Sequence, residues 1–206
     1  DSMDECMFSS YNAYLKLISV NQRINNLEEI NSEKRKEFRR LRPFIRGGED
    51  YILFFFIIED GIKIIDQLHF DKIREEKKHK LVEYKKALYE ERDFLLKNNR
   101  DLWLNLNPLF EVGNFLKEKS SFDNVFILST KKKEYVFEIL KFHEINFPRE
   151  NITYTLPQEK INNLLNLLKQ KGVDLSKSIF IEDQVEFLLE AKKFNVGVSL
   201  VDWSYA

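Results

Sequence analysis

The chain has a single cysteine, few glycines and prolines, and almost no net charge. Cys6 stands alone among 206 residues, which excludes an internal disulfide framework and favours a reducing compartment. A net charge of −1 gives no global field that would favour nucleic acid or a membrane surface as partner. The longest apolar run, YILFFFII at 51–58, is too short to span a bilayer, and the acidic start DSMDECMF is no signal peptide. These absences predict a soluble, cytoplasmic globular protein that binds neither nucleic acid nor membrane.

The hydrophobic pattern divides the chain into two parts. As far as residue 118 the apolar residues recur at helical spacing, for example over 71–96, where charged residues fill the opposite face. From residue 122 onward, short apolar strands alternate with helical segments. The strands are expected at 124–130, 151–156, 178–183 and 196–203, and the helices at 133–145, 158–172 and 185–194.

This alternation predicts an α/β fold with a parallel sheet and crossover helices. The strands are almost continuously apolar, which is typical of parallel strands that are covered on both faces. Gly172 follows the helix expected at 158–172 and is predicted to end it.

Polar side chains follow two of the expected strands. The first strand ends in Ser129 and Thr130, and the third ends in the carboxylates Glu182 and Asp183. Lys160 lies near the start of the helix between them. Ligands of parallel α/β sheets bind beyond the carboxyl ends of the strands. Hydroxyls, an ammonium and two carboxylates at that edge suit a phosphate with a hard divalent cation such as Mg²⁺.

Several motifs in the second part resemble those of the haloacid-dehalogenase-like hydrolases. VFILSTKKKEYVFEIL resembles the second motif of that family, Lys160 in QEKINNLL matches the lysine of the third, and IFIEDQVEFLLEAKKFNVGVSL matches the acidic fourth motif. NPLFEVGNFLKEK and the tail VSLVDWSYA are similar to segments that flank these motifs. Gln184 and Phe187 depart from the usual pattern of the fourth motif.

The resemblance implies a Rossmann-like core with an α-helical cap, in the branch of β-phosphoglucomutase-like and phosphoglycolate phosphatase-like proteins. It assigns residues 1–8 and 96–206 to the core and residues 9–95 to the cap. The central first strand of the family's sheet is missing from the printed chain, and DSMDE resembles the residues just past the nucleophile loop. We therefore expect strands 125–130 and 178–183 not to pair directly, but to leave a gap of about 10 Å, or two strand spacings.

The resemblance also implies an activity. It predicts a Mg²⁺-dependent phosphohydrolase for a small phosphorylated metabolite, in which an upstream aspartate forms an aspartyl phosphate. Ser129 and Lys160 would be catalytic, Thr130 would bind substrate, and Glu182 and Asp183 would hold the metal. The chain as printed is expected to be inactive.

Two further segments can each be interpreted in two ways. In the loop RLRPFIRGGEDY, Arg42 and Arg46 are candidates to bind an anionic substrate, and ordinary ion pairs in a surface turn are the alternative. FFFIIEDGIKI superficially resembles the nucleophile motif, but Ile58 would take the nucleophile's place, so buried helical core ended by a turn at 59–61 is predicted instead. For the whole protein, the alternatives are a phosphosugar mutase, a phosphonatase, or a non-catalytic binding protein on the same fold.

Overall fold

The computed structural model describes residues 2–110, 112–119 and 121–201, and the chain falls into two compact units, Asp1–Pro108 and Leu109–Ala206. Asp1 and the tail 202–206, on which parts of the family resemblance rest, lie outside the described residues. The division by contacts places residues 1–8 and 96–108 in the first unit, whereas the sequence assigned them to the core. The assignment of core and cap stays a prediction.

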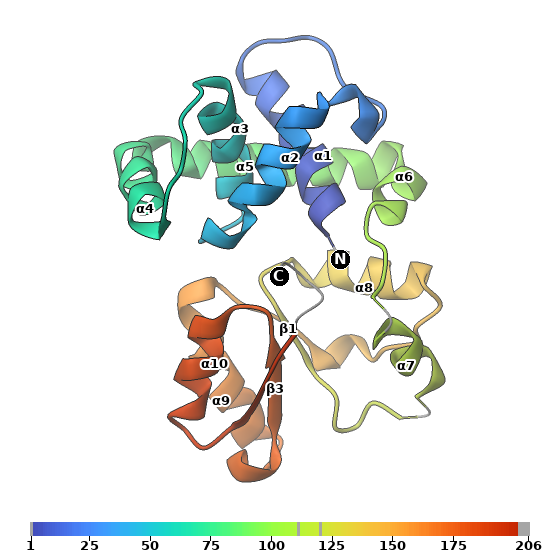
Figure 1. The fold of residues 1–206 in the computed structure, drawn as a ribbon. Coiled ribbons are helices and arrows are strands. Elements are labelled where there is room, and N and C mark those ends of the chain that lie inside the picture. The colour runs from blue at the N-terminus through green and yellow to red at the C-terminus, as the bar shows by residue number, and fades with distance from the viewer. Residues whose placement is uncertain (1, 111, 120, 202–206) are drawn as a thin grey trace. The chain divides into compact units, whose positions relative to one another are not determined.

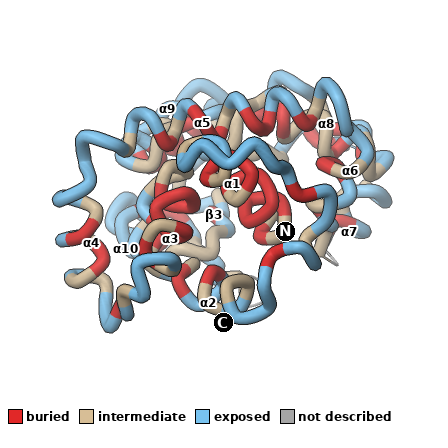
Figure 2. Tube along the Cα trace, turned by 90° about the horizontal axis from the view of Figure 1, so that it is seen from above, coloured by how far each residue is buried: buried red, intermediate tan, exposed pale blue. Residues whose placement is uncertain are grey.

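All the regular secondary structure in the described residues of the first unit is helical (Figure 1). Its α-helices are α1 Met3–Leu17, α2 Ser32–Leu41, α3 Asp50–Glu59, α4 Gln67–Glu76, α5 Lys78–Asn98 and α6 Arg100–Asn105. Helix α1 packs against both α3 and α5, and Figure 2 shows buried residues along α1 and α3. Phe8, Phe38, Phe54 and Trp103 are fully buried at this centre. Burial of such large side chains is the main stabilising contribution to this unit.

Helix α3 confirms the interpretation of the apolar run. Phe54, Phe55 and Ile57 are all buried, and the helix is apolar on every side, as expected for a helix surrounded by other elements. The turn after it places Gly61 at φ 65°, a left-handed conformation that glycine adopts without steric cost. The FFFII part of the FFFIIEDGIKI segment is therefore helical core, and the exposed residues 59–61 end the helix in a turn, as predicted.

The helix expected over 71–96 is two helices. Helix α4 begins earlier, at Gln67, because the Asp66 carboxylate accepts a hydrogen bond from the His69 N–H at 2.7 Å and caps the helix. It ends at Glu76, and α5 starts after Lys77. No glycine or proline marks this turn in the sequence, so the charged pattern concealed it.

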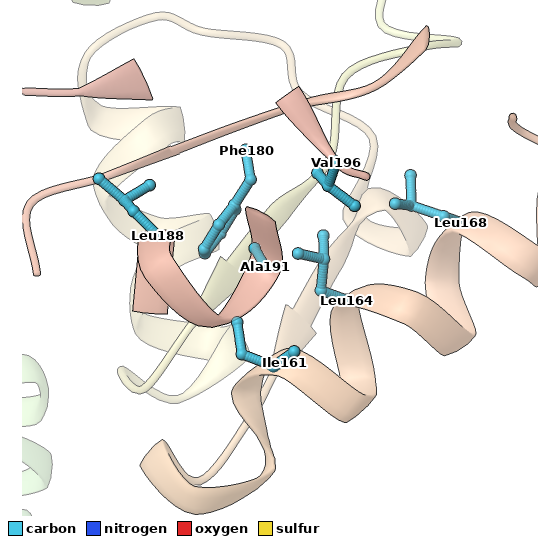
Figure 3. Packing of buried hydrophobic residues seen from close by; sticks show 7 residues of the cluster. All are labelled: Ile161, Leu164, Leu168, Phe180, Leu188, Ala191 and Val196. Carbon is cyan, nitrogen blue, oxygen red and sulfur yellow. The ribbon is translucent and has the colours of Figure 1, made fainter. Parts of the chain in front are cut away.

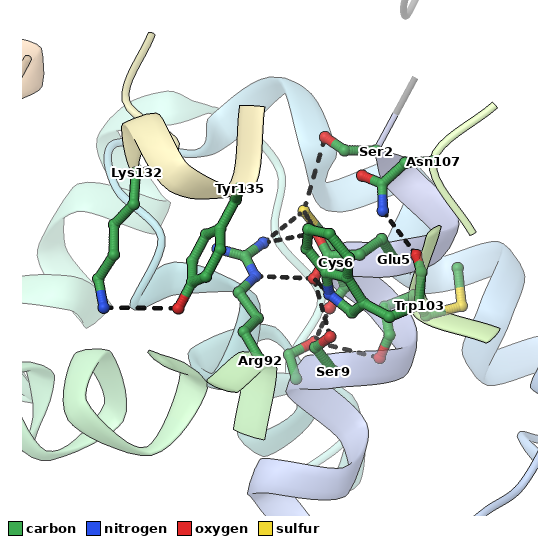
Figure 4. A network of polar contacts seen from close by, with 11 residues as sticks. Ser2, Glu5, Cys6, Ser9, Arg92, Trp103, Asn107, Lys132 and Tyr135 are labelled. Carbon is green, nitrogen blue, oxygen red and sulfur yellow. Dashed lines mark hydrogen bonds and ion pairs between the residues drawn. The ribbon is translucent and has the colours of Figure 1, made fainter. Parts of the chain in front are cut away.

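A buried polar cluster links α1, α5 and α6 (Figure 4). Arg92 donates two hydrogen bonds to Glu5, Nε to Oε1 at 2.7 Å and Nη2 to Oε2 at 2.8 Å. Ser9 Oγ and Trp103 Nε1 also donate to Glu5 Oε1, at 2.8 and 3.1 Å. A buried charge is tolerated when it is paired and hydrogen-bonded in this way.

The second unit alternates strands and helices in the predicted order. Its elements are α7 Val112–Glu118, β1 Ile127–Ser129, α8 Lys133–Phe142, β2 Ile152–Tyr154, α9 Lys160–Gln170, β3 Ile179–Glu182, α10 Val185–Lys192 and β4 Gly197–Leu200. The strands are shorter than expected. Gly172, at φ 64°, follows the end of α9 as predicted. The protein is therefore mixed α/β.

The strands of this unit form two separate parallel pairs. β1 pairs with β2, Ile127 opposite Ile152, and β3 pairs with β4, Ile179 opposite Gly197. Among the described residues β1 and β3 do not pair, which confirms that part of the expectation; the width of the gap stays a prediction. The pattern predicts a single sheet, whereas the structure has two, which are separated between β1 and β3.

One face of β3 is buried and the other is exposed. Figure 3 shows Phe180 pointing into a cluster with side chains of α9 and α10, against which Leu128 of β1 also packs. Ile179 and Ile181 point to the opposite face and are 72% and 59% exposed. The expectation that the strands are covered on both faces is therefore wrong for β3 within the part of the chain that is described.

None of the helices in the described ranges is both long enough and apolar enough to cross a membrane.

Candidate functional site

The candidate site is formed by the carboxyl ends of β1 and β3 together with the start of α9. Ser129 is the last residue of β1; its carbonyl accepts the Thr155 N–H at 2.9 Å, and its hydroxyl oxygen accepts the Lys131 N–H at 3.1 Å. Thr130, which follows, is exposed. The Ser129 hydroxyl thus shapes the turn after the strand and still has its own proton to donate.

The start of α9 is attached to this strand end through Thr155. Asn163 Nδ2 donates to Thr155 Oγ1 at 2.8 Å, and Thr155 is the residue whose N–H is bound by Ser129. Asn163 and Lys160 are three residues apart and lie on the same side of the helix. This chain of hydrogen bonds brings the first turn of α9 to the carboxyl end of β1 and β2.

Lys160 connects the same helix to the end of β3. Its ammonium donates a hydrogen bond to Glu182 Oε2, and each of the two side chains is only 9% exposed. The ammonium also lies 4.7 Å from the centre of the Phe187 ring, a cation–π distance. The carboxylate at the end of this buried strand therefore has the Lys160 ammonium as its counter-ion.

The second oxygen of Glu182 is bound by the chain itself. Oε1 accepts the N–H groups of Asp183 at 3.2 Å and of Gln184 at 3.4 Å. Burial raises the pKa of Glu182 and the neighbouring Asp183 carboxylate adds to the rise, while Lys160 opposes both. The site therefore holds two adjacent carboxylates and one ammonium in a poorly solvated corner.

This donor set fits Mg²⁺ in one particular mode. No group of three or more His, Cys, Asp or Glu side chains that could hold a metal occurs in the described ranges. Mg²⁺, however, keeps several waters and is commonly bound by one or two carboxylates plus substrate phosphate oxygens. Glu182 and Asp183 could supply those carboxylates, and water and phosphate would complete the coordination.

The two arginines proposed to bind substrate lie in the first unit. The Arg46 guanidinium makes a bidentate ion pair with Asp71, Nε to Oδ1 at 3.2 Å and Nη2 to Oδ2 at 3.0 Å. Arg42 lies 5.9 Å from the centre of the Tyr51 ring. Arg46 is thus engaged in the kind of ion pair that was the alternative interpretation, and substrate binding by both arginines stays a prediction.

The Asp50 carboxylate binds the backbone of the loop that contains Arg46, a role that was not predicted from the sequence. Its buried Oδ2 accepts the N–H groups of Arg46 at 2.7 Å and Gly47 at 2.9 Å, and Oδ1 accepts Arg74 Nε at 2.8 Å. Burial raises the pKa of Asp50, and Arg74 opposes the rise. An acidic residue three positions after Gly47, at the first residue of a helix, is a signal that could have identified this role.

Comparison of the chain with protein-family models, with curated proteins and with solved structures found no match.

Proposed function

We propose that the second unit binds a small phosphorylated metabolite and Mg²⁺ at the carboxyl ends of β1 and β3, as the core of a cytoplasmic haloacid-dehalogenase-like phosphohydrolase. The observation that carries this proposal is the buried Lys160–Glu182 pair. It places an ammonium and a carboxylate side by side at the end of a parallel strand, where α/β proteins bind their ligands.

The division of the sheet supports the same proposal. Ser178 and Glu182 direct their carbonyls to β4, where they accept the N–H groups of Gly197 at 3.0 Å and Val201 at 3.1 Å. Because strand residues alternate, the backbone groups of Ile179 and Ile181 face the opposite edge. An additional parallel strand between β3 and β1 would satisfy them, and it is the strand that carries the nucleophile in the family that the motifs resemble.

Each site residue has a chemical role in this proposal. The hydroxyls of Ser129 and Thr130 hydrogen-bond phosphoryl oxygens, and Lys160 neutralises their charge. Glu182 and Asp183 hold Mg²⁺, which when bound neutralises further phosphoryl charge. The attacking aspartate that this chemistry requires is not among these residues.

Phosphate binding tests the proposal directly. Titration of inorganic phosphate in the presence of Mg²⁺, followed by calorimetry, is expected to give saturable binding that Ser129→Ala and Lys160→Met each weaken by about tenfold, because each removes a donor to the anion. Lys171→Met is the matched control: Lys171 follows the same helix and lies 5.1 Å from the Phe126 ring, and Glu182 is not its partner. Equal phosphate binding by all three variants would contradict the proposed site.

Turnover needs a separate assay. A chain extended by a strand that carries such an aspartate is expected to release phosphate from a panel of phosphate monoesters in a Mg²⁺-dependent manner. A lack of activity across the panel would remove the catalytic part of the proposal.

A non-catalytic binding protein is the second candidate. It is favoured by Gln184 and Phe187, which depart from the resembled motif, and by the absence of a larger acidic group around Glu182 and Asp183 in the described ranges. This candidate expects phosphate and Mg²⁺ to bind without turnover even in a chain extended by a nucleophile-bearing strand.

A further inference from the structure

We propose that the Lys160 ammonium is an internal competitor of Mg²⁺ for Glu182, and that anion and metal binding are consequently coupled at this site. The inference rests on the proposed function, since it concerns the same two ligands. It adds that the two ligands bind cooperatively through one ion pair.

The competition follows from the contacts of Glu182. Oε2 is bound by the Lys160 ammonium, and Oε1 by the backbone N–H groups of Asp183 and Gln184. Both oxygens are therefore engaged, and the side chain is 9% exposed. A divalent cation that binds Oε2 must take the position of the ammonium, because two cations at one oxygen repel each other.

Separating the Lys160 ammonium from Glu182 also has a free-energy cost for the lysine. Lys160 is as buried as its partner, and the centre of the Phe187 ring lies 4.7 Å from its nitrogen. Release from Glu182 would leave a poorly solvated charge without a counter-ion, which is costly. A phosphoryl oxygen bound at the ends of β1 and β3 would supply that counter-ion.

The anion and Mg²⁺ are therefore expected to bind cooperatively. An anion that draws Lys160 away leaves Glu182 available for Mg²⁺, and Mg²⁺ that occupies Glu182 leaves Lys160 available for the anion. Whichever ligand binds first breaks the ion pair, so the second ligand does not bear that cost. By linkage the effect is equal in both directions.

Metal titrations without any anionic ligand test the competition. Mg²⁺ binding by calorimetry, and Mn²⁺ binding by electron paramagnetic resonance, would be compared in a chloride buffer for the unaltered chain, Lys160→Met, Lys171→Met and Glu182→Gln. K160M is expected to bind the metal about tenfold more tightly than the unaltered chain, because Glu182 no longer has an internal cation. K171M is expected to bind as the unaltered chain does, and E182Q more weakly than K160M.

The outcomes separate this inference from the proposed function. Equal metal affinity of the unaltered chain and K160M, with weaker binding by E182Q, would overturn the competition and leave the metal site standing. No metal binding by any of these proteins would overturn both. Thermal unfolding would confirm that each variant is folded, and Lys160→Gln, which retains a neutral donor, provides a second test in which tighter metal binding is again expected.

The coupling is measured by repeating the Mg²⁺ titration with saturating inorganic phosphate. Phosphate is expected to tighten Mg²⁺ binding to the unaltered chain by more than it does in K160Q. An equal increase in both would show that phosphate acts on the metal directly and would overturn the role of Lys160.

Discussion

Arg92 and Glu5 form the most deeply buried ion pair among the described residues, with side chains 5% and 0% exposed. We expect Arg92→Met to lower the free energy of unfolding by about 3–5 kcal/mol, because it removes the guanidinium that pairs with the buried Glu5 carboxylate. The double variant Glu5→Gln/Arg92→Met should lose less, since no charge remains. Urea unfolding at pH 7 measures both; a double variant less stable than R92M would contradict this explanation.

Glu91 predicts a pH dependence of stability. Burial raises its pKa above the ordinary 4.5, and Arg23 opposes the rise. Between the two values the folded protein holds the proton more tightly than the unfolded chain does, so the free energy of unfolding falls as pH rises through this window. Relative to Glu91→Gln, which has no titrating group at this position, the unaltered chain should therefore gain stability on acidification from neutral pH toward 4.5. Denaturant titrations at several pH values measure this. The same change in the free energy of unfolding with pH in both proteins would refute it.

Residues of the candidate site were easier to predict than the buried pair of the first unit. The positions of Lys160, Glu182 and Ser129 at the ends of elements could be predicted, because these residues follow or precede regular apolar segments and such segment ends meet in parallel α/β proteins. Their roles stay predictions. Glu5 and Arg92 lie in two helices far apart in the sequence, and no periodic pattern connects them. The contact of Lys160 with Glu182, and the place of Phe187 beside it, likewise depend on packing that the sequence does not express.

At the scale of elements, Gly172 ends α9 in a left-handed conformation with no atom near the position of a Cβ. Gly172→Ala should therefore cost about 1 kcal/mol through backbone strain alone. Gly172→Asn should cost less, because asparagine tolerates this conformation better. Thermal or denaturant unfolding measures the order; G172N less stable than G172A would contradict the assignment of strain.

The order of strands and helices in the second unit was predictable because hydrophobic periodicity is a local property. The ends of elements were less predictable. The strands β1 and β3 are shorter than the expected ranges 124–130 and 178–183, and the turn at Lys77 has no breaking residue. The exposure of Ile179 and Ile181 could not be predicted, since an apolar strand gives no sign of whether both its faces find partners.

At the scale of the whole molecule, the two units differ in how completely they bury their side chains. The first contains Phe8, Phe54 and Trp103 at 0% exposure, whereas the second has two smaller clusters around Phe180 and Ile152. We expect amides of α1 and α5 to exchange with deuterium at least about tenfold more slowly than those of β1 and β3. Native-state exchange followed by mass spectrometry tests this, and slower exchange in the strands would reverse the order.

The edge of β3 that is not paired with β4 has a consequence for the behaviour of concentrated solutions. An exposed strand edge with isoleucines beside it is a template on which another chain can add a strand, and natural proteins protect such edges with charge. Ile181→Lys should therefore reduce concentration-dependent association in light scattering, whereas Leu189→Lys, on α10 and 60% exposed, should reduce it less. The arrangement that leaves room for a further strand would then also set the concentration at which this protein begins to aggregate.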